Sequence, residues 1–199
     1  DETQDAAQIA LAVALYRRLT ELHGQGIDGI WARIIKNAFA PLFQGRFDFV
    51  AGNPPWVNWA SLPKDYRKEI VPLWAAHNLF SHKGFEAILG KSKDDISVLL
   101  TYIALDNYLK PKGRLGFVIT QSVFKTAGGG QGFRRFLLGD GTPVRVLGVD
   151  DLVEIKPFEG AANRTAIVLL QRGQQTKYPV QYNLWRRAVP GRVPEEATL

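Results

Sequence analysis

The stretch FDFVAGNPPW, residues 47–56, places an amide, two prolines and an aromatic ring directly after an apolar segment. Residues 47–51, apolar except for Asp48, predict a buried β-strand. Two successive prolines donate no backbone N–H and hold φ near one value, so the turn after this strand is rigid and its carbonyl oxygens stay available as hydrogen-bond acceptors. The Asn53 side chain adds a further acceptor, and Trp56 adds a flat aromatic face.

This set of groups suits the transfer of a methyl group to an exocyclic amino nitrogen of a base flipped out of a duplex. An amino group held by two acceptors is drawn out of conjugation with the purine ring, and its lone pair is then free to attack an electrophilic methyl group. The Trp56 ring offers the flipped base a stacking surface, worth about 1–3 kcal/mol in proteins that bind single strands. The turn at residues 53–56 is therefore the predicted catalytic element.

The composition indicates a globular protein with a polyanionic partner. The 199 residues are 46% hydrophobic, and 25 basic against 19 acidic residues give a formal charge of +6. A basic surface also occurs on proteins that bind no nucleic acid, so the charge alone leaves the partner open. There is no cysteine, which excludes disulfides, thiolate metal sites and cysteine nucleophiles, and the three histidines lack the spacing of a helical metal pair. We expect no metal site.

Two absences bear on the setting of the chain. No apolar segment is long enough to span a bilayer, and the acidic residues 1–5 are unlike a secretory signal, so we expect a cytoplasmic location. The chain also contains no methionine and hence no initiator residue. We therefore expect it to be part of a longer polypeptide.

Hydrophobic periodicity predicts strands that alternate with helices. Helices are expected over 5–22, 29–38, 96–109 and 132–138, and strands over 47–51, 114–120, 144–149 and 165–170. The alternation predicts an α/β sheet with right-handed crossovers, in which the closely spaced last two strands pair antiparallel. We expect a helical segment over 1–45, a catalytic domain over 46–172, and a short strand and coil over 173–199 that lead out of it.

Residues 57–93 lose any regular period and interleave aromatic with basic side chains. A long irregular insertion in a compact domain is usually functional. One interpretation is a cover over the turn at 53–56 that also contacts DNA. The other is a structural lid whose aromatic side chains are buried, and the sequence leaves both open.

With these elements in place, the chain resembles the amino-group (N6-adenine) DNA methyltransferases that carry an N-P-P-[YFW] motif, in particular the large restriction-modification and phage-defence type. FDFVAGNPPWVNW resembles their catalytic strand and turn, KSKDDISVLLTYIALDNYLKPKGRLGFVIT the following helix and strand, and FEGAANRTAIVLL the late segment that closes the base pocket. The resemblance covers most of residues 31–170. It implies the latter half of a Rossmann-like, S-adenosylmethionine-dependent methyltransferase sheet, with parallel strands and a terminal antiparallel strand.

In such enzymes the methyl donor is S-adenosylmethionine and the partner is double-stranded DNA with a flipped adenine. The resemblance implies that Asn53 and the Pro54 carbonyl hold the adenine amino group, that Pro55 packs near the cofactor and that Trp56 stacks on the base. Phe158 would contact the other side of the base, although a role as a core or loop anchor is equally open. Donor sulfur, methyl and nitrogen must be in line, so positioning carries much of the catalysis.

The donor side matches the family less well. The family's glycine-rich cofactor loop lies upstream of the NPPW turn, and residues 1–45 contain no strand followed by such a loop. Asn37 and Phe39 stand where the family holds the cofactor adenine, and Asp95 and Leu100 resemble cofactor-side residues of the following helix. Capping and core packing are open alternatives for these four. We expect an incomplete donor site, completed by the remainder of a larger polypeptide that also carries the target-recognition domain.

A glycine-rich stretch at 128–132, followed by Asp150 and Asp151, has some features of a dinucleotide-binding loop. In a true fingerprint the glycines follow the strand immediately, whereas here residues 121–127 intervene. A loop that contacts DNA phosphates, with Arg134 and Arg135 close by, is therefore the preferred interpretation.

Three other functions compete with DNA methylation. Glu154 and Lys156, which follow Asp140, Asp150 and Asp151, have the spacing of a restriction-nuclease metal site, which the adjacent Pro157 makes less favourable. A non-catalytic module that binds DNA or a partner is the second alternative. The third keeps the chemistry but acts on amino groups of RNA or protein.

Overall fold

The computed structural model describes residues 2–26, 28–80, 94–125, 130–158, 160 and 163–188. The chain divides into two compact units, Asp1–Gly45 and Arg46–Leu199. The first unit consists of helices α1 (Glu2–Gly24) and α2 (Asp28–Phe43), which pack on each other. Both expected helices are confirmed, and α2 continues to Phe43, beyond the expected end at 38.

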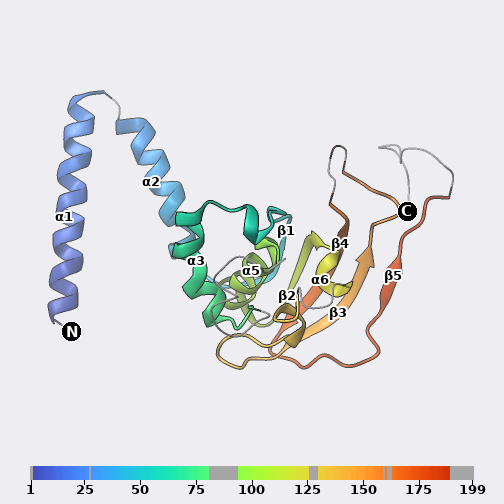
Figure 1. The fold of residues 1–199 in the computed structure, drawn as a ribbon. Helices are drawn as coiled ribbons and strands as arrows, with labels where there is room; N and C mark the ends of the chain where they lie inside the picture. Colours follow the sequence, from blue (N-terminus) through green and yellow to red (C-terminus); the bar gives the residue numbers. More distant parts are fainter. Residues whose placement is uncertain are drawn as a thin grey trace. The chain divides into compact units, whose positions relative to one another are not determined.

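The second unit is built on a five-stranded sheet (Figure 1). Its strands are β1 (Phe47–Gly52), β2 (Leu109–Thr120), β3 (Val144–Asp151), β4 (Thr165–Arg172) and β5 (Tyr182–Leu184). Their order across the sheet is β1-β2-β4-β3-β5. β1 pairs parallel with β2, β4 runs antiparallel to both β2 and β3, and β5 pairs parallel with β3. This mixed α/β sheet confirms the expected fold class.

β4 occupies the centre of the sheet, between β2 and β3. Its pairing with β3 confirms the expected antiparallel arrangement, and its insertion beside β2 brings residues 163–165 next to the end of β2. The last strand, β5, returns residues 182–184 of the C-terminal segment to the sheet rather than leading them out of the domain.

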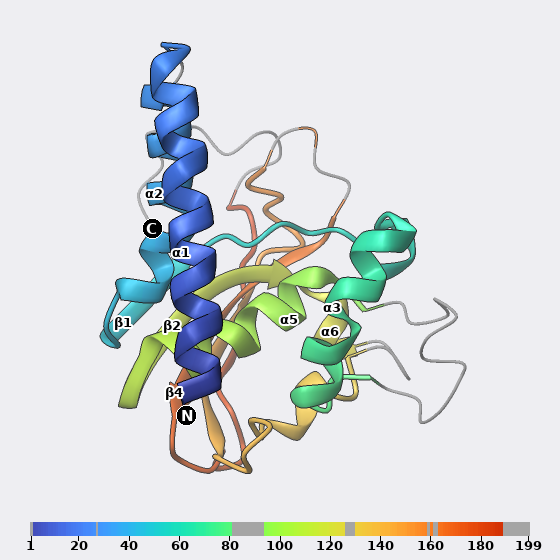
Figure 2. The same ribbon diagram turned by 90° about the vertical axis from the view of Figure 1, so that its left-hand side faces the viewer.

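Helices α5 (Ile96–Ile103) and α3 (Lys64–Ala76) pack over the part of the sheet that contains β2. Helix α5 lies across β2, and α3 lies beside α5 (Figure 2). Asp95 caps α5, because its Oδ1 accepts the Ser97 N–H at 2.9 Å. The core between helix and sheet is apolar and fully buried; it includes Val98, Leu105, Leu115, Ile119, Val168 and Leu170.

Two expected boundaries are wrong. The helix expected over 96–109 ends at Ile103 and is followed by a π-helical turn, η2 (Ala104–Tyr108), and β2 begins at Leu109 rather than at 114. Phe47 pairs with Leu109 and Phe49 with Arg114, so two steps along β1 correspond to five along β2. Residues 110–113 therefore form a bulge, which no local sequence pattern predicts as strand.

The helix expected over 132–138 is also wrong. That segment forms only a 3-10 turn, η3 (Phe133–Arg135), because Phe136 adopts a left-handed conformation with φ 49° that ends it. The buried Tyr102 hydroxyl donates to the Phe133 carbonyl at 2.7 Å, so tertiary contacts hold this turn. A four-residue helix, α6 (Ser122–Lys125), was not expected.

The described part of the insertion supports its structural interpretation. Trp59, in the 3-10 turn η1 (Trp59–Ser61), is 1% exposed, and Trp74 of α3 is 0% exposed. Their rings meet edge to face at 5.3 Å, and Phe80 stacks on Trp74 at 5.6 Å. These aromatic side chains therefore form core. Residues 81–93 of the insertion lie outside the described residues.

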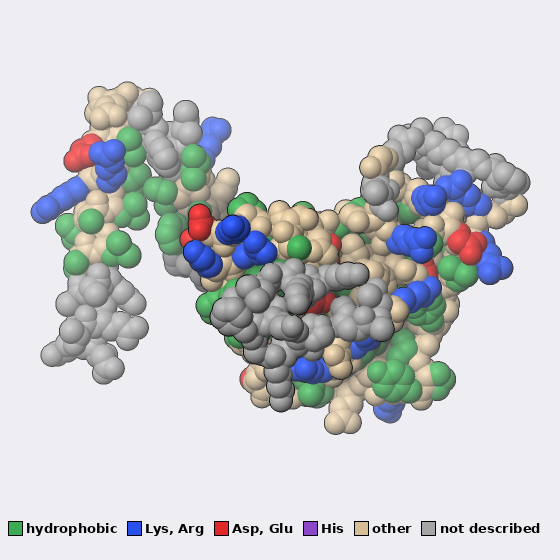
Figure 3. Space-filling model, viewed as in Figure 1, with side chains coloured by type: hydrophobic (Ala, Val, Ile, Leu, Met, Phe, Trp, Pro, Cys, Tyr) green, Lys and Arg blue, Asp and Glu red, His purple; other side chains and the backbone are tan. Residues whose placement is uncertain are grey.

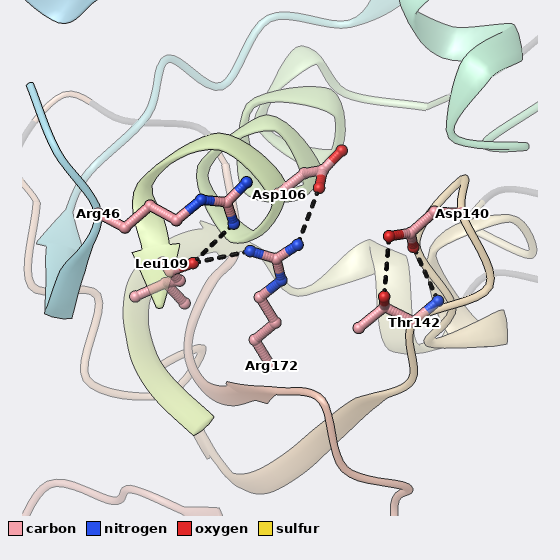
Figure 4. A network of polar contacts seen from close by, with 6 residues as sticks. All are labelled: Arg46, Asp106, Leu109, Asp140, Thr142 and Arg172. Atoms are coloured by element: carbon pink, nitrogen blue, oxygen red, sulfur yellow. Dashed lines mark hydrogen bonds and ion pairs between the residues drawn. The ribbon is translucent and has the colours of Figure 1, made fainter. Parts of the chain in front are cut away.

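One edge of the sheet is fixed by arginines (Figure 4). The buried Arg172, at the end of β4, donates to the Leu109 carbonyl at 2.8 Å and pairs with Asp106 at 3.3 Å. Arg46, just before β1, donates to the same carbonyl at 3.0 Å. The ends of three strands are thus joined at this edge, and the opposite edge carries the candidate site.

Candidate active site

The carboxyl ends of β1, β2 and β3 lie at one edge of the sheet, where the antiparallel β4 begins. The Gln121 N–H after β2 donates to the Arg164 carbonyl at 2.8 Å, and the Leu152 N–H after β3 donates to the Thr165 carbonyl at 3.0 Å. Ligands of open α/β sheets bind at this edge. The NPPW turn, which follows β1, lies there too.

The turn presents unused hydrogen-bond acceptors. Asn53 is exposed and Pro54 is buried. Within the described ranges, neither the Asn53 side chain nor the Pro54 carbonyl takes part in any hydrogen bond. Gly52 lets the turn sit close to the sheet, since a Cβ there would lie 3.1 Å from the Phe117 ring. The Asn53 side chain is therefore available to a ligand, and the Pro54 carbonyl has no partner among the described residues.

Trp56 is held at both ends. Its indole Nε1 donates to the Val118 carbonyl at 3.0 Å, and its own carbonyl accepts the Asn163 Nδ2–H at 3.3 Å. The Phe158 ring lies 5.0 Å from the Trp56 ring at 67°, an edge-to-face contact. The fold thus brings together two residues that are about a hundred positions apart. Because the rings touch, a base enters between them only if they separate.

Two neighbouring cavities lie at this edge, and Phe158 lines the first of them. The first has a volume of about 340 Å³ and is lined by Phe158, Asn163 and Arg164 among others; the second, of about 590 Å³, extends toward Gln121 and Lys125. Asn163 and Arg164 line both cavities. No sequence motif marks Asn163 as a site residue. Its only signal is a polar side chain placed between the aromatic Phe158 and an apolar strand.

A buried carboxylate, Asp151, binds two of the residues that line the second cavity, Gln121 and Lys125. Asp151 is 0% exposed, and its Oδ2 accepts hydrogen bonds from Tyr182 Oη at 2.6 Å, Gln121 Nε2 at 2.8 Å and Lys125 Nζ at 3.0 Å. Burial raises the pKa of Asp151, but the hydrogen bonds from Tyr182, Gln121 and Lys125 outweigh it and bring the pKa to about 2. Asp151 therefore stays ionised and ties β3 to β5, α6 and the end of β2.

We expect Asp151→Asn to destabilise the protein by about 2 kcal/mol at neutral pH. The pKa of Asp151 is about 2 in the folded protein, below its ordinary 3.8, so the ionised group stabilises the fold above about pH 4 and this stabilisation is lost as the pH falls toward 2. Urea unfolding between pH 7 and pH 2.5 measures the effect. The variant should lose part of the steep acid dependence; an unchanged profile contradicts the role given to Asp151.

The expected donor-side residues fit a cofactor only in part. The Asp95 carboxylate is engaged in capping α5, and burial raises its pKa although the bond from Ser97 opposes this. Leu100 is half-buried against the core. Only Pro55, in the turn, is exposed at the site. Asn37 and Phe39 are exposed on α2 of the first unit.

The acidic residues weighed for a nuclease are used elsewhere. Glu154 pairs with Arg186 at 3.4 Å, and Asp140 accepts two hydrogen bonds from Thr142, at 2.8 and 2.9 Å. Across the residues that the structure describes, no three His, Asp or Glu side chains gather as they would around a metal ion.

The arginines expected to contact DNA near the glycine-rich loop bind the protein itself. Arg134 donates to the Val123 carbonyl, and Arg135 to the Asn78 carbonyl at 3.1 Å. Gly130 has φ 69° and donates its N–H to Asp94. Residues 126–129 of the loop lie outside the described residues.

Residues 17–151 match the model of the Eco57I restriction-modification methylase family, which is more than half of the chain. The chain belongs to this family. None of the curated proteins compared with the sequence matches it. No helix in the described ranges combines the length and the hydropathy needed to cross a membrane.

Several solved structures of larger proteins are similar to part of this Eco57I-family chain. A Listeria monocytogenes protein described as a class I S-adenosylmethionine-dependent methyltransferase is 14% identical over 71% of this chain, with a TM-score of 0.48. DrdV in complex with DNA is 18% identical over 77% (TM-score 0.49), and the Type ISP restriction-modification enzyme LlaGI with a DNA substrate mimic is 17% identical over 68% (TM-score 0.46). This chain spans 38%, 16% and 14% of those chains, respectively.

Proposed function

We propose that this chain forms the base-holding part of a DNA methyltransferase that transfers a methyl group from S-adenosylmethionine to the N6 amino group of adenine. The observation that carries the proposal is the NPPW turn at the carboxyl edge of the sheet, with the Asn53 side chain and the Pro54 carbonyl free to accept hydrogen bonds. Membership of the Eco57I restriction-modification methylase family supports it.

Asn53 and Pro54 act on the amino group. Their oxygens each accept one N–H of the group, which turns the nitrogen lone pair out of the ring system and toward the donor side. They also stabilise the positive charge that develops on the nitrogen when it gains a methyl group and before it releases a proton. Acceptors fixed in advance contribute most to such charge stabilisation, and the proline pair fixes them.

Trp56 and Phe158 hold the ring of the base. The bond from Trp56 Nε1 to Val118 fixes the indole plane, so stacking on it costs little side-chain entropy. Phe158 then closes on the opposite side of the base, after the edge-to-face contact with Trp56 has opened.

The methyl donor supplies an electrophilic methyl group when it is bound. Of the described residues expected on the donor side, Pro55 and the neighbouring acceptors would adjoin it, because Asp95 and Leu100 serve capping and packing. We infer that the rest of the donor site, and the domain that reads the DNA sequence, belong to further parts of the polypeptide.

Transfer of labelled methyl groups by the full-length protein tests the proposal. With S-adenosylmethionine labelled in its methyl group and duplex DNA, we expect label on N6-methyladenine after digestion to nucleosides. Label on N4-methylcytosine overturns the base assignment. Label on RNA or protein, and not on DNA, favours the alternative substrates. Binding of DNA without any transfer favours a non-catalytic module.

A further inference from the structure

Basic side chains gather over the part of the second unit that holds β3, β4 and β5 (Figure 3). Most of those near the candidate site already have a partner. Lys125 pairs with Asp151 at 3.0 Å, and Arg186 with Glu154 at 3.4 Å. Asp150 accepts hydrogen bonds from Asn183 and Trp185, so no carboxylate at this edge is left unpaired in the described residues.

Lys156 and Arg164 differ from these residues. Both are exposed, and in the described part of the chain neither side chain makes a hydrogen bond or an ion pair. Both line the cavity of about 340 Å³ beside Phe158, and the other residues that line this cavity carry no charge. The cavity therefore holds two uncompensated positive charges.

The backbone holds these two residues in place while their side chains stay available. The Arg164 carbonyl accepts the Gln121 N–H at 2.8 Å, and its neighbour Asn163 binds the Trp56 carbonyl at 3.3 Å. Lys156 donates its N–H to the Leu152 carbonyl at 3.0 Å and has φ 45°, a left-handed conformation that costs a non-glycine residue about 1 kcal/mol or more. Lys156 thus stands at a backbone position where glycine would be less strained.

We propose that this cavity binds a backbone phosphate of the nucleic acid strand, next to the nucleotide whose base contacts Trp56, through Lys156 and Arg164. This inference rests on the proposed function. Arginine and lysine side chains are the usual partners of DNA phosphates, and such contacts set the position of the strand without reading its sequence. A phosphate held beside Phe158 would place the sugar of the flipped nucleotide at the mouth of the base site.

Salt dependence of DNA binding by the full-length protein tests the site. Duplex DNA binding is measured by fluorescence anisotropy over a series of KCl concentrations, without methyl donor, for Lys156→Gln, Arg164→Gln and the double variant. We expect each single variant to bind about tenfold more weakly, as for loss of a hydrogen bond to a charged group. The slope of log K against log [KCl] should fall by about 1 for each single variant and further for the double variant.

Lys112→Gln and Arg114→Gln are matched controls. Lys112 is an exposed lysine with φ 64°, and Arg114 is an exposed arginine. Both lie in the amino-terminal half of β2, away from the cavity beside Phe158. These substitutions remove the same charges but lie away from the cavity. We therefore expect the slope of log K against log [KCl] to stay at the wild-type value. A double Lys156/Arg164 variant with the slope of these controls overturns the phosphate site while leaving methyl transfer untouched.

Two further arms separate this site from the proposed function. In the first, the wild-type protein binds RNA of the same sequence and not DNA, and the double variant lowers the salt dependence of RNA binding. The phosphate site then stands and the DNA assignment fails. If the double variant loses binding of S-adenosylmethionine alone and keeps DNA binding, the two cations serve the donor carboxylate and the phosphate site is overturned. Failure of the wild-type protein to bind either nucleic acid overturns both.

Discussion

Replacing Asn53 with alanine should lower the rate of methyl transfer by roughly a hundredfold to a thousandfold, the cost typical of losing one preorganised polar contact to a developing charge. The side chain is exposed and makes no hydrogen bond in the described structure, so its loss removes nothing that holds the fold together. We expect unchanged thermal unfolding and a loss that appears in kcat more than in KM. Single-turnover transfer of labelled methyl groups measures the rate constant of the methyl-transfer step.

Asn58 offers a control of the same residue type five positions away. Its Oδ1 accepts the Ala60 N–H at 2.9 Å and caps η1, so Asn58→Ala should cost about 1 kcal/mol of stability and leave kcat unchanged. Asn53→Asp keeps an acceptor oxygen and should be more active than Asn53→Ala. Equal, wild-type rates in Asn53→Ala and Asn58→Ala would refute the role assigned to Asn53.

Trp74→Ala should destabilise the second unit by about 3–5 kcal/mol, the range for truncating a fully buried aromatic side chain. The ring is 0% exposed and packs between Trp59 and Phe80 at 5.3 and 5.6 Å. Among the described residues its Nε1 has no hydrogen-bond partner, so Trp74→Phe, which also removes this N–H, should cost much less. Urea unfolding followed by circular dichroism gives both values.

Tyr66, on the same helix, is 44% exposed and serves as the control. Tyr66→Ala should change the unfolding free energy by no more than about 0.5 kcal/mol. The comparison also separates the two interpretations of the insertion at 57–93. A Trp74→Ala protein of normal stability and weakened DNA binding would place this ring in a nucleic-acid interface and contradict its assignment to the core.

Local patterns predicted most of the strands and helices correctly. The expectation that the strand at 47–51 is buried is wrong, because β1 is an edge strand whose side chains are mostly exposed. Alternation of apolar strands and amphipathic helices predicted the α/β sheet. Capping was one of the roles predicted for Asp95, and Asp95 is the N-cap of α5. Local patterns failed where long-range contacts decide the backbone. The bulge at 110–113 exists because β1 pairs across it, and the turn at Phe133 is held by Tyr102, thirty-one residues away.

The sequence by itself determined the class of fold and the hydrogen-bonding groups that the NPPW turn offers, because proline geometry and an amide acceptor are local properties. It also carried the family, since residues 17–151 match as one block. Only the tertiary structure decided which side chains share the site. The insertion of β4 between β2 and β3 brings Phe158, Asn163 and Arg164 to Trp56, and sheet order depends on pairing between distant strands that no short segment encodes. The same contacts decide which of the basic residues are neutralised and which remain available to a ligand.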